Sequence, residues 1–159
     1  MNWLEEVEQA RKNQSFAGAM AILARELELR PEDAQVHYQI ACTHDGLGQE
    51  KDAVAPYERA IELGLPPEDL PSAYLGLGST LRNLGEYERS ANVFQQGRKA
   101  FPEYRALTVF YSLTLFNLRQ HERAMEILLT ELVETTTDPS IKSYERALRF
   151  YSDKLNETF

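Results

Sequence analysis

The residues best suited to chemistry are two histidines and the single cysteine, which lie within eight positions of one another. His37 and His44 are seven residues apart, so on a helix they would share one face, and Cys42 lies between them. Imidazole and thiolate groups are ligands that zinc prefers, and a cysteine beside a histidine can act as a nucleophile. This segment is therefore the first candidate for a metal site or for covalent catalysis.

The spacing supports neither chemistry. A zinc site needs three or four ligands, and the third histidine, His121, lies far along the chain. Cys42 and His44 are two residues apart, so their side chains would point about 200° apart around a helix. The sequence has no P-loop, GxGxxG, GxSxG or HExxH motif, and no acidic residue in an apolar stretch that would shift its pKa for acid–base work. We expect no enzyme, no metal site and no cofactor, with both histidines packed in the core. A metal protein or enzyme built on these three residues is the alternative.

Length and composition indicate one globular domain. The chain has 159 residues, of which 43 % are hydrophobic and 10 % aromatic, so it can bury a continuous core. A single cysteine excludes internal disulfides. The start of the chain has neither a basic nor an apolar signal region, and the longest apolar-leaning run, residues 106–116, is shorter than the roughly 20 residues of a membrane span. These features predict a soluble, cytoplasmic protein.

The charge is unevenly distributed and restricts the partners. The net charge is −8, with 14 acids and 6 bases in residues 1–70 but 11 of each in residues 71–159. An acidic first half repels phosphate backbones and anionic lipid, so we expect neither a nucleic acid nor a membrane as partner. The simplest interpretation is a well-solvated exterior, and the alternative is that the asymmetry orients a partner with a basic end.

The elements that position these residues recur along the chain. Residues 46–64, 83–102 and 117–132 align on their turns, with offsets of 37 and 34 residues. The equivalent positions are Gly48, Gly85 and Arg119 at the turn, then Ala53, Ser90 and Ala124, then Tyr57, Phe94 and Leu128. An earlier copy, 34 residues before the first, has Gln14 at the turn and ends at Pro31. Self-similarity near this period is typical of a stacked helical array.

Each copy has the pattern of two helices joined by a tight turn. Apolar residues recur at helical spacing on both sides of the turn. Small residues mark where two helices approach closely: Ala41, Gly78 and Ser112 in the first helix, and Ala53, Ser90 and Ala124 in the second. Gly48 and Gly85 suit a left-handed cap, whereas Arg119 predicts a less sharp turn.

These residues resemble the tetratricopeptide repeat (TPR) over residues 1–138. The positions usually held by Trp are Trp3, His37, Tyr74 and Thr108, and the small residue of the first helix falls at Val7, Ala41, Gly78 and Ser112. The resemblance implies an all-α fold, a right-handed α-α superhelix (solenoid) of about four helix-turn-helix units over residues 1–33, 34–70, 71–104 and 105–138. The whole chain, residues 1–159, is then a single TPR domain.

The last stretch of the chain predicts a capping helix over residues 139–157. Asp138 or Ser140 can cap it and Pro139 suits its first turn. Its apolar stripe consists of Ile141, Tyr144, Leu148, Tyr151 and Leu155. Such a helix would cover the end of the stack.

In this family, partner peptides usually lie against the first helix of each unit, on the concave side. The matching positions, which we predict to bind a partner, are Leu4, Glu8 and Arg11 in the first unit; Tyr38, Cys42 and Asp45 in the second; Leu75, Ser79, Arg82 and Asn83 in the third; and Val109, Leu113, Phe116 and Asn117 in the fourth. Leu4, Tyr38, Leu75 and Val109 would form an apolar row. The fourth unit is the most apolar, and the alternative there is that the last helix folds over Val109, Leu113 and Phe116 and buries them.

The resemblance implies a non-enzymatic protein–protein interaction module that binds a peptide or protein partner in its groove, as an adaptor or assembly chaperone. Some members of the family bind the C-terminal carboxylate of heat-shock chaperones with Lys, Asn and Arg side chains. The corresponding positions here are Leu4, Glu8, Gln39, Ser72 and Gly76, and none matches, so we do not expect that ligand. The alternative function is a homo-oligomeric scaffold, such as a homodimer, that uses the groove or the end helix for self-association.

Overall fold

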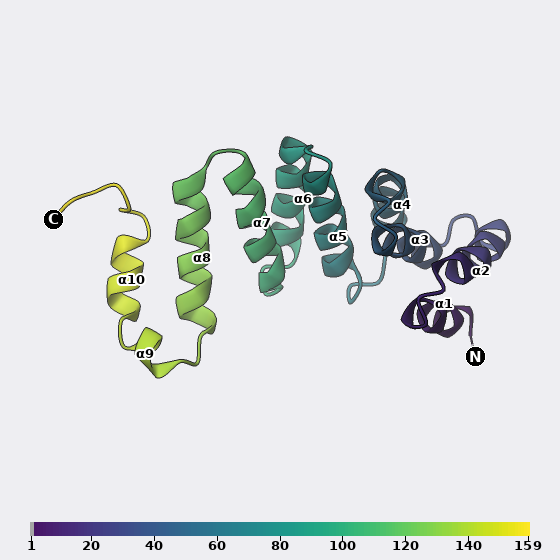
Figure 1. Cartoon of the computed structure of the whole chain (residues 1–159), viewed down its shortest axis with the longest axis horizontal. Helices are drawn as coiled ribbons and strands as arrows, with labels where there is room; N and C mark the ends of the chain where they lie inside the picture. The colour runs from purple at the N-terminus through teal and green to yellow at the C-terminus, as the bar shows by residue number, and fades with distance from the viewer. Residues whose placement is uncertain (1) are drawn as a thin grey trace. The chain divides into compact units, whose positions relative to one another are not determined.

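The computed structural model describes residues 2–159, and every regular element in that range is an α-helix (Figure 1). The all-α prediction is therefore confirmed. The chain divides into two compact units, unit 1 up to Glu86 and unit 2 from Tyr87 to Phe159. The handedness of the superhelix and the single domain over the whole chain stay predictions.

Within each unit the helices follow one another as antiparallel neighbours (Figure 1). Unit 1 contains α1 (Trp3–Lys12), α2 (Phe16–Leu29), α3 (Ala34–Gly46), α4 (Glu50–Leu63) and α5 (Leu70–Asn83). Unit 2 contains α6 (Tyr87–Ala100), α7 (Arg105–Asn117), α8 (His121–Thr135), α9 (Pro139–Lys142) and α10 (Glu145–Tyr151). The helices that pack together within a unit are mostly adjacent in sequence, which is typical of a helical repeat.

Short polar side chains fix where several helices begin. The Asn2 side chain accepts a hydrogen bond from the Glu5 backbone N–H at 2.9 Å, and the Glu5 carboxylate accepts one from the Asn2 N–H at 3.0 Å, which completes a capping box. The Asp33 side chain accepts hydrogen bonds from backbone N–H groups in the first turn of α3, and the Asp138 side chain does so at α9. Each cap satisfies backbone donors that the first helical turn leaves unpaired.

The turn inside each helix pair has a left-handed residue. Gly48 has φ 67° and Gly85 has φ 79°, as their positions in the repeat predicted. Arg119 has φ 60°, so the prediction of a less sharp turn there is wrong. The reason is that the Gln120 N–H must reach the Leu115 carbonyl at 2.9 Å to close the helix end. The backbone bond decides the geometry, and the arginine adopts it at a steric cost of about 1–2 kcal/mol.

The core of each unit forms where the repeat pattern predicts close helix contacts. The small positions are all buried: Ala41, Gly78 and Ser112 on the first helices, and Ala53, Ser90 and Ala124 on the second. In unit 1, one apolar cluster is built from Val7, Ala19, Leu23, Val36 and Ile40. In unit 2, Phe94 is fully buried and its ring lies 6.4 Å from that of Tyr111. Small residues against large rings set the distances between helices.

The end of unit 2 differs from the sequence prediction. Residues 139–157 were expected to form one helix, but α9 ends at Lys142 and α10 covers only Glu145–Tyr151. The chain turns between them, where the Tyr144 N–H bonds to the Ile141 carbonyl at 3.0 Å and the Ser143 hydroxyl bonds to the Ser140 carbonyl. The expected apolar stripe is broken as a consequence, since Ile141 and Leu148 are half-buried but Tyr144, Tyr151 and Leu155 are exposed. α10 nevertheless packs on α8.

A buried carboxylate in unit 1 gives a pH-dependent prediction. Glu26 is buried and ion-paired with Arg30, whose hydrogen bond holds the pKa of Glu26 below its ordinary value of 4.5. A lowered folded-state pKa stabilises the fold above the unfolded-state pKa, and this stabilisation is lost as the pH falls through the folded-state pKa. Urea unfolding at a series of pH values should show wild type more stable than Glu26→Gln near neutrality, with the difference shrinking below pH 4.5. Glu28→Gln, at an exposed position of the same helix, is the control, and an equal loss for both variants would contradict the assignment.

Candidate functional site

The predicted site residues of α3 form an internal polar network in unit 1. The Tyr57 hydroxyl of α4 donates to Asp45 Oδ2 at 2.6 Å, and the Thr80 hydroxyl of α5 donates to Asp45 Oδ1 at 2.8 Å. Both carboxylate oxygens are therefore engaged by neighbouring helices. Asp45 ties α3, α4 and α5 together, which is a positioning role within the fold.

Cys42 and Tyr38 lie in the same network. The Tyr57 hydroxyl is 3.8 Å from Cys42 Sγ, and the Tyr38 and Tyr57 ring centroids are 6.2 Å apart. Burial is the main cause that raises the pKa of the Cys42 thiol and of both tyrosines. A thiol whose pKa is raised is a poor nucleophile, so this arrangement favours packing over covalent chemistry at Cys42.

The other predicted residues of unit 1 vary in exposure. Arg11 donates to the side chain of Gln39 and lies 3.5 Å from the Gln39 carbonyl and the Thr43 hydroxyl. The remaining predicted positions are exposed at Glu8 and Asn83, and half-buried at Leu4, Leu75, Ser79 and Arg82. Unit 1 therefore offers a contact surface in which several side chains already serve the fold.

The two histidines near Cys42 bond to groups close by in the sequence. His37 Nε2 is 2.8 Å from the Pro31 carbonyl, and His44 Nδ1 is 2.8 Å from Gln49 Oε1. Both are half-buried. Within residues 2–159 no three His, Cys, Asp or Glu side chains are grouped so that they could hold a metal ion.

Two of the predicted residues of α7, Leu113 and Phe116, line an open apolar groove in unit 2. Val109, Leu113 and Phe116 are spaced by four and three residues and are exposed, with Phe116 at 60 %. Asn117 is half-buried at the end of the helix. A hollow of about 180 Å³ lies beside them, lined by Ser112, Leu113, Phe116, His121, Ala124, Met125 and Leu128. We call this surface the α7–α8 groove.

Sequence reasoning missed the α8 side of this groove. His121, Met125 and Leu128 repeat the spacing of four and three that marks Val109, Leu113 and Phe116 on α7. The His121 and Phe116 rings lie 4.7 Å apart and close one end. The signal was therefore present, as a second stripe at this spacing, formed by His121, Met125 and Leu128, whose side chains remain exposed.

The last helix leaves this groove uncovered. α10 packs on α8, where Arg149 lies 3.5 Å from Glu134, and Asn156, in the segment after α10, donates to Glu122 at 2.8 Å. The alternative in which the last helix buries Val109, Leu113 and Phe116 is therefore wrong, because all three remain exposed.

Comparison with known families agrees with the repeat pattern. A family model described as "Tetratrico peptide repeat" matches residues 34–155, which is more than half of the chain. The chain belongs to the tetratricopeptide repeat family. Repeats of this family generally mediate protein–protein interaction and are typically non-catalytic. A search of the curated proteins gave no match to the chain.

The TPR frame explains why the groove is open. Leu128 occupies the place of Tyr57 and Phe94 in the repeat, yet it is 36 % exposed whereas those rings are 3 % and 0 % exposed. Tyr57 lies in a helix that packs against the following helix, α5, at Gly76. After α8 the chain instead forms the four-residue α9 and the seven-residue α10. Among the described residues, no full-length helix follows α8 to cover Leu128, which therefore stays exposed.

No helix among residues 2–159 of this TPR protein is both long and apolar enough to cross a bilayer.

Proposed function

We propose that this TPR protein is a non-enzymatic interaction module that binds a peptide or protein partner in the α7–α8 groove. The observation that carries the proposal is the exposed row of Val109, Leu113 and Phe116 beside an apolar hollow of about 180 Å³. The two walls repeat a spacing of four and three, with apolar side chains except at His121, and this suits an amphipathic helix or an extended segment with apolar anchors.

Unit 1 differs from unit 2 in its charge. Up to Glu86 the chain has 15 acids and 7 bases, whereas residues 87–159 have 10 of each. An acidic unit disfavours nucleic acid and anionic lipid and favours a partner segment with basic residues. Within unit 1, the half-buried Leu4 and Leu75 remain a separate proposed contact surface, whose helices Tyr38, Cys42 and Asp45 would hold in place.

We propose that the protein acts through this binding as an adaptor or assembly chaperone. We also propose a cytoplasmic location, because a chain with one cysteine has no internal disulfide that would require an oxidising compartment.

The test uses a photo-crosslinking phenylalanine analogue at position 116 in cells that produce the protein. We expect a discrete covalent adduct with one partner. Position 29, where Leu29 of unit 1 is 70 % exposed, is the matched control and should give no such adduct.

The partner identified in this way should bind purified Phe116→Glu at least tenfold more weakly than wild type, a loss of about 1.4 kcal/mol. Leu29→Glu introduces the same charge at a similarly exposed site and should bind normally. Equal adducts at both positions, or wild-type affinity of Phe116→Glu, would refute groove binding.

A further inference from the structure

We propose that unit 2 carries a second interaction surface, centred on α10, that pairs two copies of this chain about a two-fold axis. This surface, the C-terminal aromatic patch, consists of Tyr144, Phe150, Tyr151 and Phe159. It is separate from the α7–α8 groove and does not depend on the function proposed for that groove.

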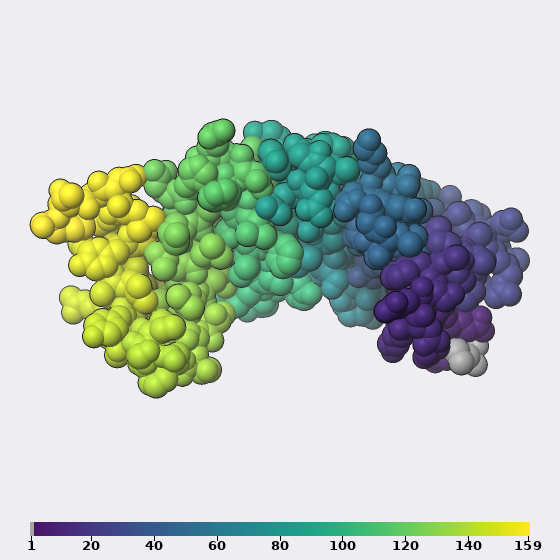
Figure 2. All heavy atoms as spheres, viewed as in Figure 1, coloured from purple at the N-terminus to yellow at the C-terminus, as the bar shows by residue number. Residues whose placement is uncertain are grey.

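The four aromatic residues form one surface. Phe159 has its ring 5.4 Å from that of Phe150 and 5.8 Å from that of Tyr151, and the Phe150 and Tyr151 rings are 5.3 Å apart. Tyr144 joins Phe150 and Tyr151 around a hollow of about 400 Å³, which Ser143, Arg146 and Ala147 complete. Figure 2 shows α10 and the residues after it, in yellow, at an edge of unit 2 with nothing over them on the visible side.

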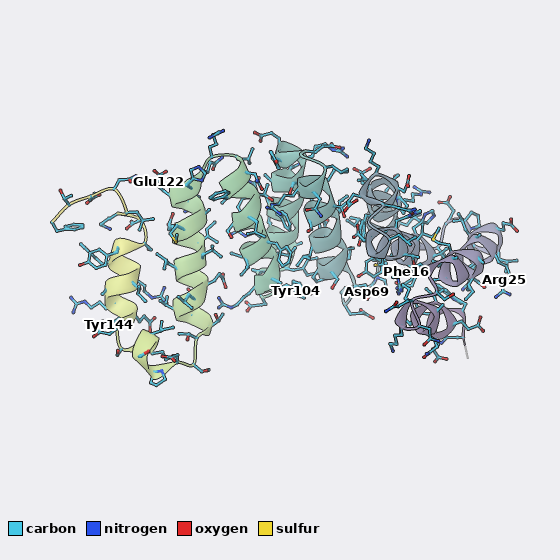
Figure 3. The ribbon with its side chains drawn as sticks, in the orientation of Figure 1. Phe16, Arg25, Asp69, Tyr104, Glu122 and Tyr144 are labelled. Carbon is cyan, nitrogen blue, oxygen red and sulfur yellow. The ribbon has the colours of Figure 1, made fainter. Side chains whose placement is uncertain are left out.

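The patch stays largely open to solvent in unit 2. Two polar side chains of this segment bond to α8: Arg149 of α10 pairs with Glu134, and Asn156, after α10, donates to Glu122. Ser152 is buried. Figure 3 shows Glu122 at one end of α8 and Tyr144 near the junction of α9 and α10, toward the opposite end of α8. The four aromatic side chains keep between 48 % and 78 % of their surface exposed. An exposed aromatic cluster of this kind marks an interaction surface.

The area of the patch fits what a stable dimer needs. Burying one aromatic side chain removes about 150–250 Å² from water, so the exposed parts of the four rings offer roughly 350–600 Å² per copy. A standard interface buries about 800 Å² per partner, of which a little more than half is apolar. The patch therefore supplies the apolar share of such an interface, and the surrounding polar side chains supply the rest.

The distribution of charge favours a second copy as the occupant. Residues 87–159 have 10 acids and 10 bases, so two copies do not repel one another through unit 2, whereas acidic unit 1 opposes self-contact. Both signs of charge lie beside the patch: Arg146 lines the hollow, and Lys154, which is paired with Asp153, lies 4.8 Å from the Phe150 ring centroid. A surface with both signs of charge favours neither a strongly basic nor a strongly acidic partner. In a two-fold dimer, however, the positive groups of one copy can face the negative groups of the other.

The experiment measures the mass of the purified full chain by sedimentation equilibrium from about 1 to 100 μM, a range that covers dissociation constants typical of weak dimers. We expect wild type to reach twice the 18.2 kDa monomer mass. Tyr144→Glu and Tyr151→Glu should each raise the dimer dissociation constant at least tenfold. Leu29→Glu, the same charge at an exposed site of unit 1, should dimerise as wild type does.

Far-UV circular dichroism and urea unfolding of each variant distinguish loss of dimerisation from loss of folding. Two exposed positions are substituted so that the result does not depend on a single variant that fails to fold. A wild-type monomer at the highest concentration, an equal effect of Leu29→Glu, or growth beyond the dimer would each overturn the proposal. Phe116→Glu should still dimerise and Tyr151→Glu should still crosslink its partner at position 116, so the two proposals can fail separately.

Discussion

Phe94→Ala is expected to lower the free energy of unfolding by about 3–5 kcal/mol. Phe94 is fully buried in unit 2, and its ring packs 6.4 Å from that of Tyr111. Truncation to alanine removes the transfer free energy of the ring and leaves a cavity between helices that small residues already hold close together. Urea unfolding followed by circular dichroism measures the loss.

Phe116→Ala is the matched control for this prediction. The same side chain is deleted from the same unit, but Phe116 is 60 % exposed in the α7–α8 groove. We expect a change within about 1 kcal/mol, since little buried contact is lost. If both variants lost the same stability, Phe94 would not hold the core position that the repeat assigns to it.

The repeat pattern predicts the interior of the stack better than its end. A residue between two full-length helices is buried by local rules alone, and for this reason the frame located Tyr57 and Phe94 correctly. At Leu128 the same position is exposed, because burial there depends on the helix that follows. The turn at Ser143 divides the predicted capping helix, and the apolar periodicity of residues 139–157 does not predict this break.

The turns between helices were also predictable only in part, because the backbone and not the side chain decides their conformation. Glycine at positions 48 and 85 gave a visible signal for a left-handed residue, whereas Gln14 with φ 58° and Arg119 with φ 60° gave none. The hydrogen bond that closes the preceding helix imposes this conformation whatever the side chain. All four turns therefore contain a left-handed residue, although the residue type predicts it only at the two glycines.

Asp45 shows why the candidate site could be predicted only in part. Its place on α3 predicts a position on the partner-binding face, and that stays a prediction; the structure shows its carboxylate bonded to neighbouring helices. Its partners, Tyr57 and Thr80, come from helices 12 and 35 residues further along the chain. Which polar residues meet across three helices depends on the packing distances, and these cannot be read from spacing within one helix.

Gly76→Ala is expected to destabilise unit 1 by about 1–3 kcal/mol. Helix propensity alone predicts the opposite, since alanine stabilises a helix interior by about 0.5–1 kcal/mol relative to glycine. A Cβ at position 76 would lie 2.6 Å from Tyr57 Cζ and 2.9 Å from Cε1, which is too close for real contacts. The ring cannot move away easily, because it is buried and its hydroxyl is bonded to Asp45.

Gly18→Ala tests whether the Tyr57 ring, and not the loss of a helical glycine, causes this effect. At position 18 the new Cβ would meet only the exposed Ser15 side chain, which can rotate away, so we expect no loss or a small gain of stability. In the Tyr57→Leu background the penalty of Gly76→Ala should shrink, because the rigid ring that opposes the methyl group is gone. Urea unfolding of wild type, Gly76→Ala, Tyr57→Leu and the double variant measures this coupling. A stabilising Gly76→Ala would mean that the Tyr57–Asp45 network yields under strain and does not fix the spacing of α3, α4 and α5.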